Sequence, residues 1–325
     1  MSTSTTGMVS LFGLDPETYV PHAIHTPGGR TYTETNCYSD ILIELIHARG
    51  DEPLAIAGFT VRMDFEGDQW TFFKPPEADL ELLYGIDIHE MQPHRFLPTQ
   101  IAEQLAAGRT MTVELDSMYL PDTASTSYRT DHVKSSIIAE AIDHEAERLR
   151  YFHNTSLYEL EGEDYRGVFR LGEFADPAAL PPYAELVRFD AGPRLEGDEL
   201  RKAALELLRG HLRRRPETNP FTRFGASLAA ELPALLEGDA AAYHSYAFAT
   251  VRMAGSAFEI LASHVEWLLG EKGADAAAAM TRIVDGCKVL SFKLARRKPF
   301  DPEPAVADLA AAWDEAMSLL DDAVG

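Results

Sequence analysis

TETNCYSDILIELIHARG, residues 33–50, predicts a helix with a cysteine, Cys37, in its first turn. Four apolar residues recur at helical spacing and form its buried stripe: Ile41, Leu42, Leu45 and Ile46. Thr35 or Asn36 can cap the helix, so Cys37 points toward the exposed N-terminal end. Unpaired amide N–H groups and the positive end of the helix dipole favour a thiolate there. The stretch therefore predicts a nucleophilic cysteine, and the alternative is a small, inert packing residue.

A histidine and an asparagine downstream are candidate partners for this thiol. TMTVELD (110–116) alternates like a strand, and the segment from His132 to Asp143 is typical of a second strand. RLRYFHN is typical of a third strand, which ends at Asn154. If the intervening turn is centred near His144 and Glu145, the two ends lie side by side. We then expect the imidazole of His132 to hydrogen-bond the amide of Asn154.

These three residues are predicted to form a catalytic triad in the chain order Cys37, His132, Asn154. A cysteine nucleophile needs a histidine that accepts the thiol proton and a third group that orients the ring. The third position stays open between Asn154 and His153, because strand alternation lets only one of them face the site.

Longer motifs carry a resemblance to known families. The segments TNCYSDILIELIHARGDEPLAIAGFTVRMDF (35–65) and VELDSMYLPD (113–122), with the hairpin from His132, resemble the cysteine-peptidase-like fold of butirosin-type acyltransferases. Those enzymes move an acyl group from a carrier protein to an amine. Further motifs resemble a bacterial domain-of-unknown-function family often encoded beside amino acid:carrier-protein ligases: ETNCY, DFEGDQWTFFK, YLPDT and YFHN followed by YELEGEDY. This second resemblance spans nearly the whole chain.

The resemblance implies an α+β fold with a papain-like N-terminal domain. It also implies an acyl or aminoacyl transferase that takes its acyl group from an acyl or aminoacyl carrier protein and passes it to a small amine. The phosphopantetheine arm would come from the carrier, and no tightly bound cofactor is expected. Papain-like proteins usually place an oxyanion-hole glutamine just before the cysteine, but residues 30–36 read RTYTETN. Asn36 or Thr35, together with the Cys37 backbone N–H, would replace it.

Composition favours two domains. A chain of 325 residues with 46% hydrophobic content can build two cores. The proline- and acid-rich stretch 176–198 separates a mixed half from one with helical runs near 198–214, 221–237, 240–270, 274–297 and 304–323. We therefore predict a catalytic domain over residues 1–185 and an all-α helical bundle over 186–325. Cys287 falls in the middle of a predicted helix and is interpreted as a packing residue.

Charge and hydropathy restrict the partners and the compartment. The formal charge of −23 disfavours nucleic acid, because phosphate binding needs a positive face. No run approaches 18 apolar residues, and the N-terminus lacks a signal-peptide pattern, so neither membrane insertion nor secretion is indicated. Two cysteines cannot form a disulfide framework. We expect a cytoplasmic protein.

Several residues are candidates for substrate binding. Asp64 and Asp68 interleave with aromatic residues and can bind the ammonium group of an aminoacyl substrate, although a solvated hairpin explains the same pattern. Tyr119 and Tyr128 are expected to help exclude water from the site. The predicted substrate-binding set is Asn36, Asp64, Asp68, Asp116, Tyr119 and Tyr128. The histidines lack a thiolate or HExxH context, so no metal site is predicted.

Two basic clusters are candidate docking sites for an acidic carrier protein. They comprise Arg209, Arg213, Arg214 and Arg215 in the first cluster, and Lys293, Arg296, Arg297 and Lys298 in the second. Charge complementarity at helix C-termini explains several of these residues equally well. Two rivals to the transferase stay open at this point. One is a cysteine peptidase or amidase with the same triad, and the other is a non-catalytic carrier-binding module.

Overall fold

The computed structural model describes residues 7–33 and 35–325, and the chain divides into two compact units. The first unit contains residues up to Pro27, Cys37–Glu52 and Leu80–Arg194. The second contains Gly28–Asn36, Pro53–Asp79 and Leu195–Gly325. Residues 28–36 and 53–79 therefore pack with the second unit, although a single cut between residues 185 and 186 assigns them to the first.

An antiparallel sheet organises the first unit, with strand order β2-β7-β3-β4-β5-β6 and β1 paired to β4. The strands are β1 (Val9–Ser10), β2 (Asp87–Met91), β3 (Thr110–Asp116), β4 (Lys134–Asp143), β5 (Arg148–His153), β6 (Ser156–Glu161) and β7 (Ala184–Arg188). The bounds of β3 are as predicted. β4 begins two residues later than predicted, so His132 precedes the strand, and β5 ends at His153 instead of Asn154.

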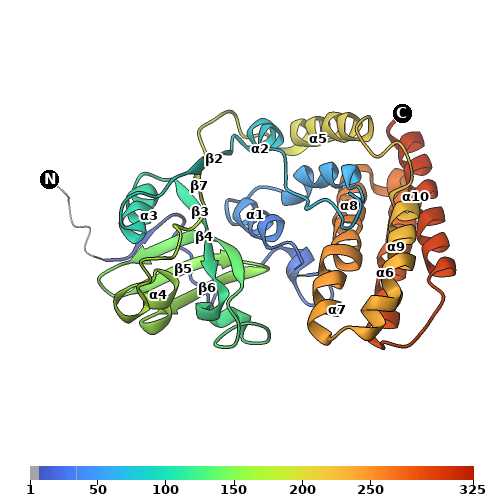
Figure 1. The fold of residues 1–325 in the computed structure, drawn as a ribbon. Helices are drawn as coiled ribbons and strands as arrows, with labels where there is room; N and C mark the ends of the chain where they lie inside the picture. The colour runs from blue at the N-terminus through green and yellow to red at the C-terminus, as the bar shows by residue number, and fades with distance from the viewer. Residues whose placement is uncertain (1–6, 34) are drawn as a thin grey trace. The chain divides into compact units, whose positions relative to one another are not determined.

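Helices cover both faces of the sheet. Helix α1 (Cys37–Ala48) packs on β4, β5 and β6 from one side, whereas α3 (Leu97–Ala106) and α4 (Glu163–Val168) cover the other (Figure 1). Ile137 and Tyr151 belong to the core beneath α3 and α4, so their strand neighbours Ile138 and Phe152 face α1. A strand buried on both faces needs apolar residues at consecutive positions, which explains the continuous apolar run in β4.

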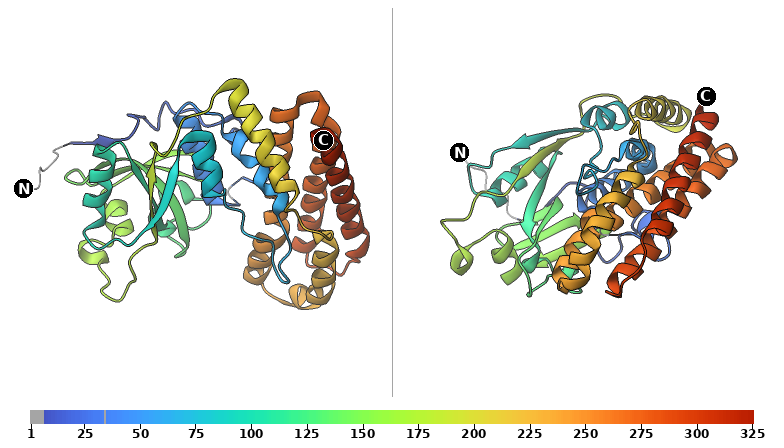
Figure 2. Two further views of the ribbon diagram at one scale, coloured as in Figure 1. Left: turned by 90° about the horizontal axis from the view of Figure 1, so that it is seen from above. Right: turned by 45° about the vertical axis from the view of Figure 1, so that its right-hand side comes forward.

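The second unit is mainly helical. Its helices are α5 (Gly197–Leu212), α6 (Pro220–Glu237), α7 (Ala240–Ala247), α8 (Met253–Leu269), α9 (Ala274–Ala295) and α10 (Glu303–Val324), and a π-helical turn, Phe248–Arg252, joins α7 to α8. Helices α8, α9 and α10 run side by side and share one core with α6 (Figure 2). These bounds agree with the predicted helical runs. Helix α2 (Glu77–Tyr84) lies in sequence at a boundary between the units.

The continuous apolar run of AIAGFTV is typical of a buried strand, but this segment is part of a 3₁₀ helix, Pro53–Arg62. Consecutive residues of this helix are buried, because it packs against both α5 and α8. Gly58 lies so close to α8 that an added Cβ would sit 2.8 Å from the His264 Nε2 atom. A fully buried 3₁₀ segment therefore produced the same apolar run that a buried strand produces.

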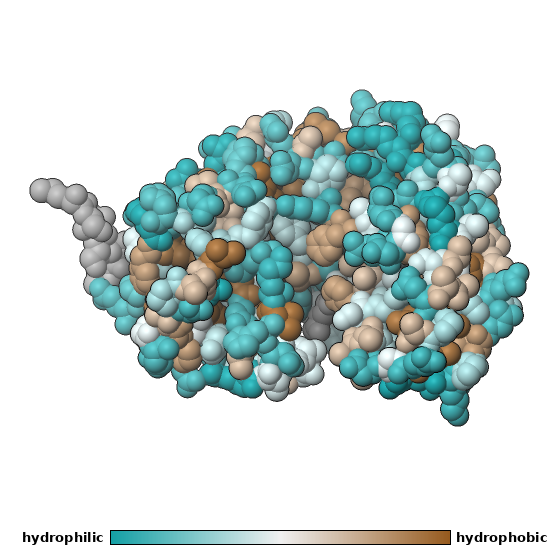
Figure 3. Space-filling view, in the orientation of Figure 1, coloured by the Kyte–Doolittle hydropathy of each residue, from teal (hydrophilic) through white to brown (hydrophobic). Residues whose placement is uncertain are grey.

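One face of the described residues can be judged by its hydropathy. The face seen in Figure 3 is largely hydrophilic, with small scattered hydrophobic areas. Among the described residues, no helix has both the length and the apolar character needed to cross a bilayer.

Candidate functional site

Cys37 is the first residue of α1 and is partly exposed. Within the described residues, its thiol makes no hydrogen bond to His132 or Asn154. Cys287 lies in α9 and is fully buried, and burial raises the pKa of its thiol to about 12. Only Cys37 therefore presents a thiol that a substrate can reach, and the predicted packing role of Cys287 agrees with its burial.

Asn36 is buried, and its amide donates a hydrogen bond to the Phe73 carbonyl oxygen at 2.6 Å. Both residues belong to the second unit. Thr35 is also buried, with its hydroxyl 3.5 Å from the Thr33 carbonyl oxygen. Both side chains that were candidates to replace the oxyanion-hole glutamine, Asn36 and Thr35, thus contact backbone carbonyl oxygens. The first-turn N–H groups of α1 are the remaining donors for an oxyanion.

His132 is held by Asp116. Its ring is 70% exposed, and its Nδ1 atom lies 2.6 Å from Asp116 Oδ2. Asp116 ends β3, and Lys134, which pairs with Asp116, begins β4. A carboxylate only accepts hydrogen bonds, so Nδ1 carries the proton and Nε2 is left as the basic nitrogen. The pair has the base-and-orienter arrangement of a catalytic dyad.

Asn154 does not meet His132, contrary to the predicted hydrogen bond. In the register of β4 and β5, Ile138 faces Phe152, which places Asn154 level with Ser136, four residues from His132. Asn154 is instead the first residue of a two-residue turn between β5 and β6, with φ 47°. Asparagine tolerates this left-handed conformation, which hairpin turns require. The residue that holds the His132 ring is therefore Asp116, which was predicted to be a substrate-binding residue.

His153, the alternative third residue, lies in a different hydrogen-bonded group. Its Nδ1 atom is 2.5 Å from Asp122 Oδ2, and its Nε2 atom is 2.6 Å from Ser135 Oγ. The imidazole is only 1% exposed. Sequence reasoning missed Ser135 and Asp122, because nothing local indicates that the loop after β3 returns to the end of β5. The nearest local signal was the YLPD motif, which contains Asp122.

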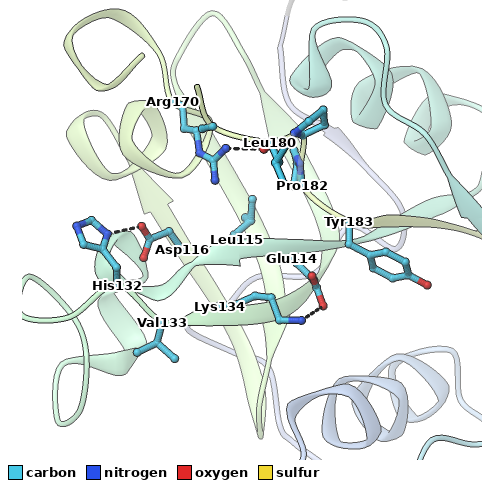
Figure 4. Close-up of a pocket in the computed structure, with 12 residues that line it drawn as sticks. Glu114, Leu115, Asp116, His132, Val133, Lys134, Arg170, Leu180, Pro182 and Tyr183 are labelled. Carbon is cyan, nitrogen blue, oxygen red and sulfur yellow. Dashed lines mark hydrogen bonds and ion pairs between the residues drawn. The ribbon is translucent and has the colours of Figure 1, made fainter. Parts of the chain in front are cut away.

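A cavity of about 570 Å³ opens beside the His132–Asp116 pair. In Figure 4, His132 and Asp116 point toward each other, and Lys134 meets Glu114 from the neighbouring strand. The Lys134 Nζ atom is 2.7 Å from Glu114 Oε1. The full lining is Glu114, Leu115, Asp116, His132, Val133, Lys134, Arg170 and Ala179–Tyr183. The cavity can hold a small acyl or amino acid group next to a base.

Tyr119 and Tyr128 lie in the loop after β3 and do not line this cavity. The Tyr128 hydroxyl donates to Asp164 Oδ2 at 3.0 Å, and the Tyr119 ring packs against Gly167. The Arg129 guanidinium lies 5.5 Å and 5.2 Å from the two ring centroids. The contacts of both tyrosines therefore anchor this loop to α4.

Asp64 and Asp68 belong to the second unit. Asp64 accepts the Phe65 N–H at 2.7 Å and pairs with Arg223. Asp68 is exposed in the turn between the bridged residues Phe65 and Trp70. The interleaved charges and aromatics thus form the solvated hairpin that was the alternative interpretation, and Asp64 already has a cation.

His25, near the N-terminus, belongs to a buried ion-pair group. His25 lies between Glu44 Oε1 at 2.5 Å and Asp40 Oδ1 at 3.2 Å, and all three side chains are buried. Asp40 and Glu44 lie one turn apart on the buried face of α1, so this group fixes the helix that begins at Cys37. In the described part of the chain, no three His, Cys, Asp or Glu residues could hold a metal ion.

Comparison with known proteins places both halves of the chain in one family. Residues 20–189 match the DUF1839 N-terminal domain, and residues 197–322 match the DUF1839 C-terminal domain. No curated protein matches the chain. The two matches together cover most of the 325 residues, and the chain therefore belongs to the DUF1839 family.

Proposed function

We propose that this protein is a cysteine-dependent acyl or aminoacyl transferase, in which Cys37 accepts an acyl group from a carrier-protein thioester and passes it to an amine. The observation that carries the proposal is the partly exposed thiol at the first residue of α1. This helix packs on an antiparallel sheet whose strand β4 begins two residues after His132, a layout that resembles papain-like enzymes.

The chemistry would proceed through one covalent intermediate. The Cys37 sulfur attacks the thioester carbonyl carbon, and His132 Nε2 accepts the thiol proton while Asp116 holds the ring. The N–H groups at the start of α1 stabilise the oxyanion, and the pantetheine thiol leaves with the proton. The amine nitrogen then bonds to the acyl carbon with His132 as base, and the bond to the Cys37 sulfur breaks as the sulfur takes the proton from His132. The proposal requires His132 to reach Cys37, and such contacts often tighten only when substrate is bound.

A non-catalytic carrier-binding module is the second candidate. It is favoured by the lack of a hydrogen bond between Cys37 and His132 among the described residues, and by the engagement of the Asn36 amide with Phe73. Such a module would bind an acyl carrier without transferring its acyl group.

Turnover of a small aminoacyl thioester in the presence of an amine tests the proposal. A transferase gives an amide, a peptidase or amidase gives the free acid, and a binding module gives neither. Iodoacetamide labelling, mapped by mass spectrometry, should modify Cys37 well before Cys287, because the thiolate is the nucleophile and Cys287 is buried with a raised pKa. Loss of turnover in Cys37→Ser is expected. Full turnover in that variant would reject the proposal.

A further inference from the structure

Ser135, His153 and Asp122 form a continuous hydrogen-bonded chain on the face of the sheet covered by α3 and α4. Ser135 lies at the start of β4, His153 ends β5, and Asp122 lies in a short 3₁₀ turn, Pro121–Thr123, after β3. The two hydrogen bonds measure 2.6 Å and 2.5 Å. Three elements that are separate in sequence therefore bring a hydroxyl, an imidazole and a carboxylate into line.

The proton positions in this chain follow from its partners. Asp122 also accepts a hydrogen bond from the Tyr151 hydroxyl through Oδ1, at 2.5 Å. Burial and the Asp122 charge raise the Tyr151 pKa well above its usual value, so the phenol keeps its proton and donates it. Both Asp122 oxygens are then acceptors, and His153 Nδ1 carries the ring proton. His153 Nε2 must accept the proton of Ser135 Oγ.

Ser135 lies next to residues that line the cavity beside His132. Leu115 faces Ser135 directly across β3 and β4, and side chains opposite each other in an antiparallel pair lie on the same face. Leu115 lines the cavity, as do Val133 and Lys134, which precede Ser135. Ser135 is partly exposed, whereas His153 and Asp122 behind it are buried. The serine is therefore the partly exposed member of the group, and it adjoins the cavity lining.

We infer that Ser135, His153 and Asp122 form a second nucleophilic site, which takes acyl groups from carboxylic esters. The Ser135 oxygen bonds to the ester carbonyl carbon, and its proton moves to His153 Nε2. The carbon–oxygen bond to the leaving alcohol breaks as that alcohol takes the proton from His153. Asp122 remains a carboxylate and holds the imidazolium. Water, deprotonated by the same ring, then bonds to the acyl carbon. The bond from that carbon to Ser135 Oγ breaks as the serine oxygen takes the proton back from His153, and the carboxylic acid is released.

This inference is independent of the chemistry proposed for Cys37. The two sites use different nucleophiles, different histidines and different carboxylates, so one can fail while the other stands. If the group is only a structural clamp, it holds the 117–131 segment to the sheet without making Ser135 reactive. Reactivity of Ser135 separates these two roles.

A fluorophosphonate probe tests the inference on the full-length chain. Its phosphorus bonds to an activated serine oxygen with loss of fluoride, and peptide mapping by mass spectrometry identifies the modified residue. We expect the adduct on Ser135 in the wild-type protein. Asp122→Asn should slow labelling by about a thousandfold or more, because the wrong imidazole tautomer is then favoured. Thermal melts establish that this variant is folded.

Ser136→Ala is the matched control, because Ser136 neighbours Ser135 on β4 but projects from the opposite face. Its labelling rate should equal that of the wild type. Hydrolysis of p-nitrophenyl acetate in a Cys37→Ala background should fall to the buffer rate when Ser135→Ala is added. An unmodified Ser135 in folded wild-type protein would overturn the inference. Equal labelling rates in the wild type and a folded Asp122→Asn variant would also overturn it, since they would show that the carboxylate has no part in activation.

Discussion

At the scale of single residues, the two histidine–aspartate pairs to which we assign chemistry lie in different surroundings. His132 with Asp116 is exposed and beside a cavity, whereas His153 with Asp122 is buried beneath Ser135. The exposed ring of His132 leaves its Nε2 atom open to a substrate, whereas the His153 Nε2 atom is engaged by Ser135 Oγ. The assignment of His132 as the base for Cys37 therefore stays a prediction with a new orienting partner, Asp116.

Substitutions at Asp116 and at Asn154 should show which of the two residues orients the His132 ring. Asp116→Asn should lower kcat/KM for acyl transfer by about 10²–10⁴-fold, because an amide no longer fixes the imidazole tautomer. Asn154→Gly is the matched control, since glycine adopts its φ of 47° without strain, and it should leave the rate nearly unchanged. Steady-state kinetics on both variants measure the difference. A loss of kcat/KM in Asn154→Gly as large as that in Asp116→Asn would support the triad of Cys37, His132 and Asn154 instead.

His25 predicts a pH dependence of stability. Burial opposes its charge, but hydrogen bonds to Asp40 and Glu44 outweigh burial and raise its pKa above 6.5. Because the folded-state pKa is raised, protonated His25 contributes its full stabilisation below pH 6.5. This contribution is lost as the pH rises through the folded-state pKa. The difference in unfolding free energy between the wild type and His25→Gln should therefore narrow from about pH 6 upward. Urea titrations measure it, and the exposed His94→Gln is the control. A difference in unfolding free energy that widens as the pH rises would contradict the pairing of His25 with Asp40 and Glu44.

At the residue scale, sequence reasoning identified candidate chemistry but not its partners. Cys37 at a helix start follows from local pattern alone, and α1 begins there. The partner of His132 depends on the pairing of β3 with β4, and the partner of His153 depends on a loop that returns across the sheet. Contacts between residues distant in sequence are not encoded in any short window. The buried His25 group was missed for the same reason, because its acids lie on α1.

At the scale of elements, local periodicity predicted strands β3, β4 and β5 and the long helices of the second unit. It failed for the 3₁₀ helix Pro53–Arg62, where burial on several sides gives an apolar run without a period. It also placed β4 two residues early, because His132 and Val133 continue the strand pattern but lie outside the strand. Such boundaries depend on where the neighbouring strand ends, and β3 ends at Asp116.

The contact between the 3₁₀ helix and α8 makes Gly58→Ala a sensitive probe of that element. The new Cβ would meet His264, which is fully buried and hydrogen-bonded to the Leu54 carbonyl oxygen at 2.7 Å. Burial lowers the His264 pKa to about 4. The ring is therefore neutral near pH 7 and gains no hydration of a charge by moving toward solvent. We expect a loss of about 1–3 kcal/mol in unfolding free energy.

Gly210→Ala in α5 is the control for this substitution, because only flexible arginine side-chain ends lie near its Cβ position, the nearest at 3.8 Å. Alanine in a helix interior should raise stability by up to about 1 kcal/mol. Chemical denaturation measures both variants. An unchanged unfolding free energy in Gly58→Ala would show that the 3₁₀ helix and α8 do not pack this closely.

At the scale of the whole molecule, each basic cluster contains some side chains that bind other parts of the fold and some that are exposed. Arg215 forms two 2.6 Å hydrogen bonds to Asp321, and Arg297 donates to the Gly238 carbonyl oxygen. Arg213 and Arg296 are exposed, and no partner for either side chain lies among the described residues. Part of each cluster therefore serves the fold, and the rest is available to an acidic partner.

Charge reversal of the exposed residues tests carrier docking. Arg213→Glu with Arg214→Glu, or Arg296→Glu with Lys298→Glu, should weaken binding of an aminoacylated carrier protein. Binding to the wild type should also weaken with salt, because exposed charges are screened over about 8 Å at physiological ionic strength. Calorimetry at two salt concentrations measures both effects, with Lys202→Glu on α5 as the control. Unchanged affinity in both reversed variants would assign the clusters to helix stabilisation alone.

The central claim is that Cys37 carries the acyl group during the reaction. The most direct measurement is the intact mass of the protein after brief incubation with an aminoacyl thioester and no amine, followed by peptide mapping. We predict one added acyl group on Cys37, its loss when an amine acceptor is supplied, and no such adduct in Cys37→Ala. An unacylated Cys37 in the incubation without amine, in protein that forms the amide product once amine is added, would contradict the account.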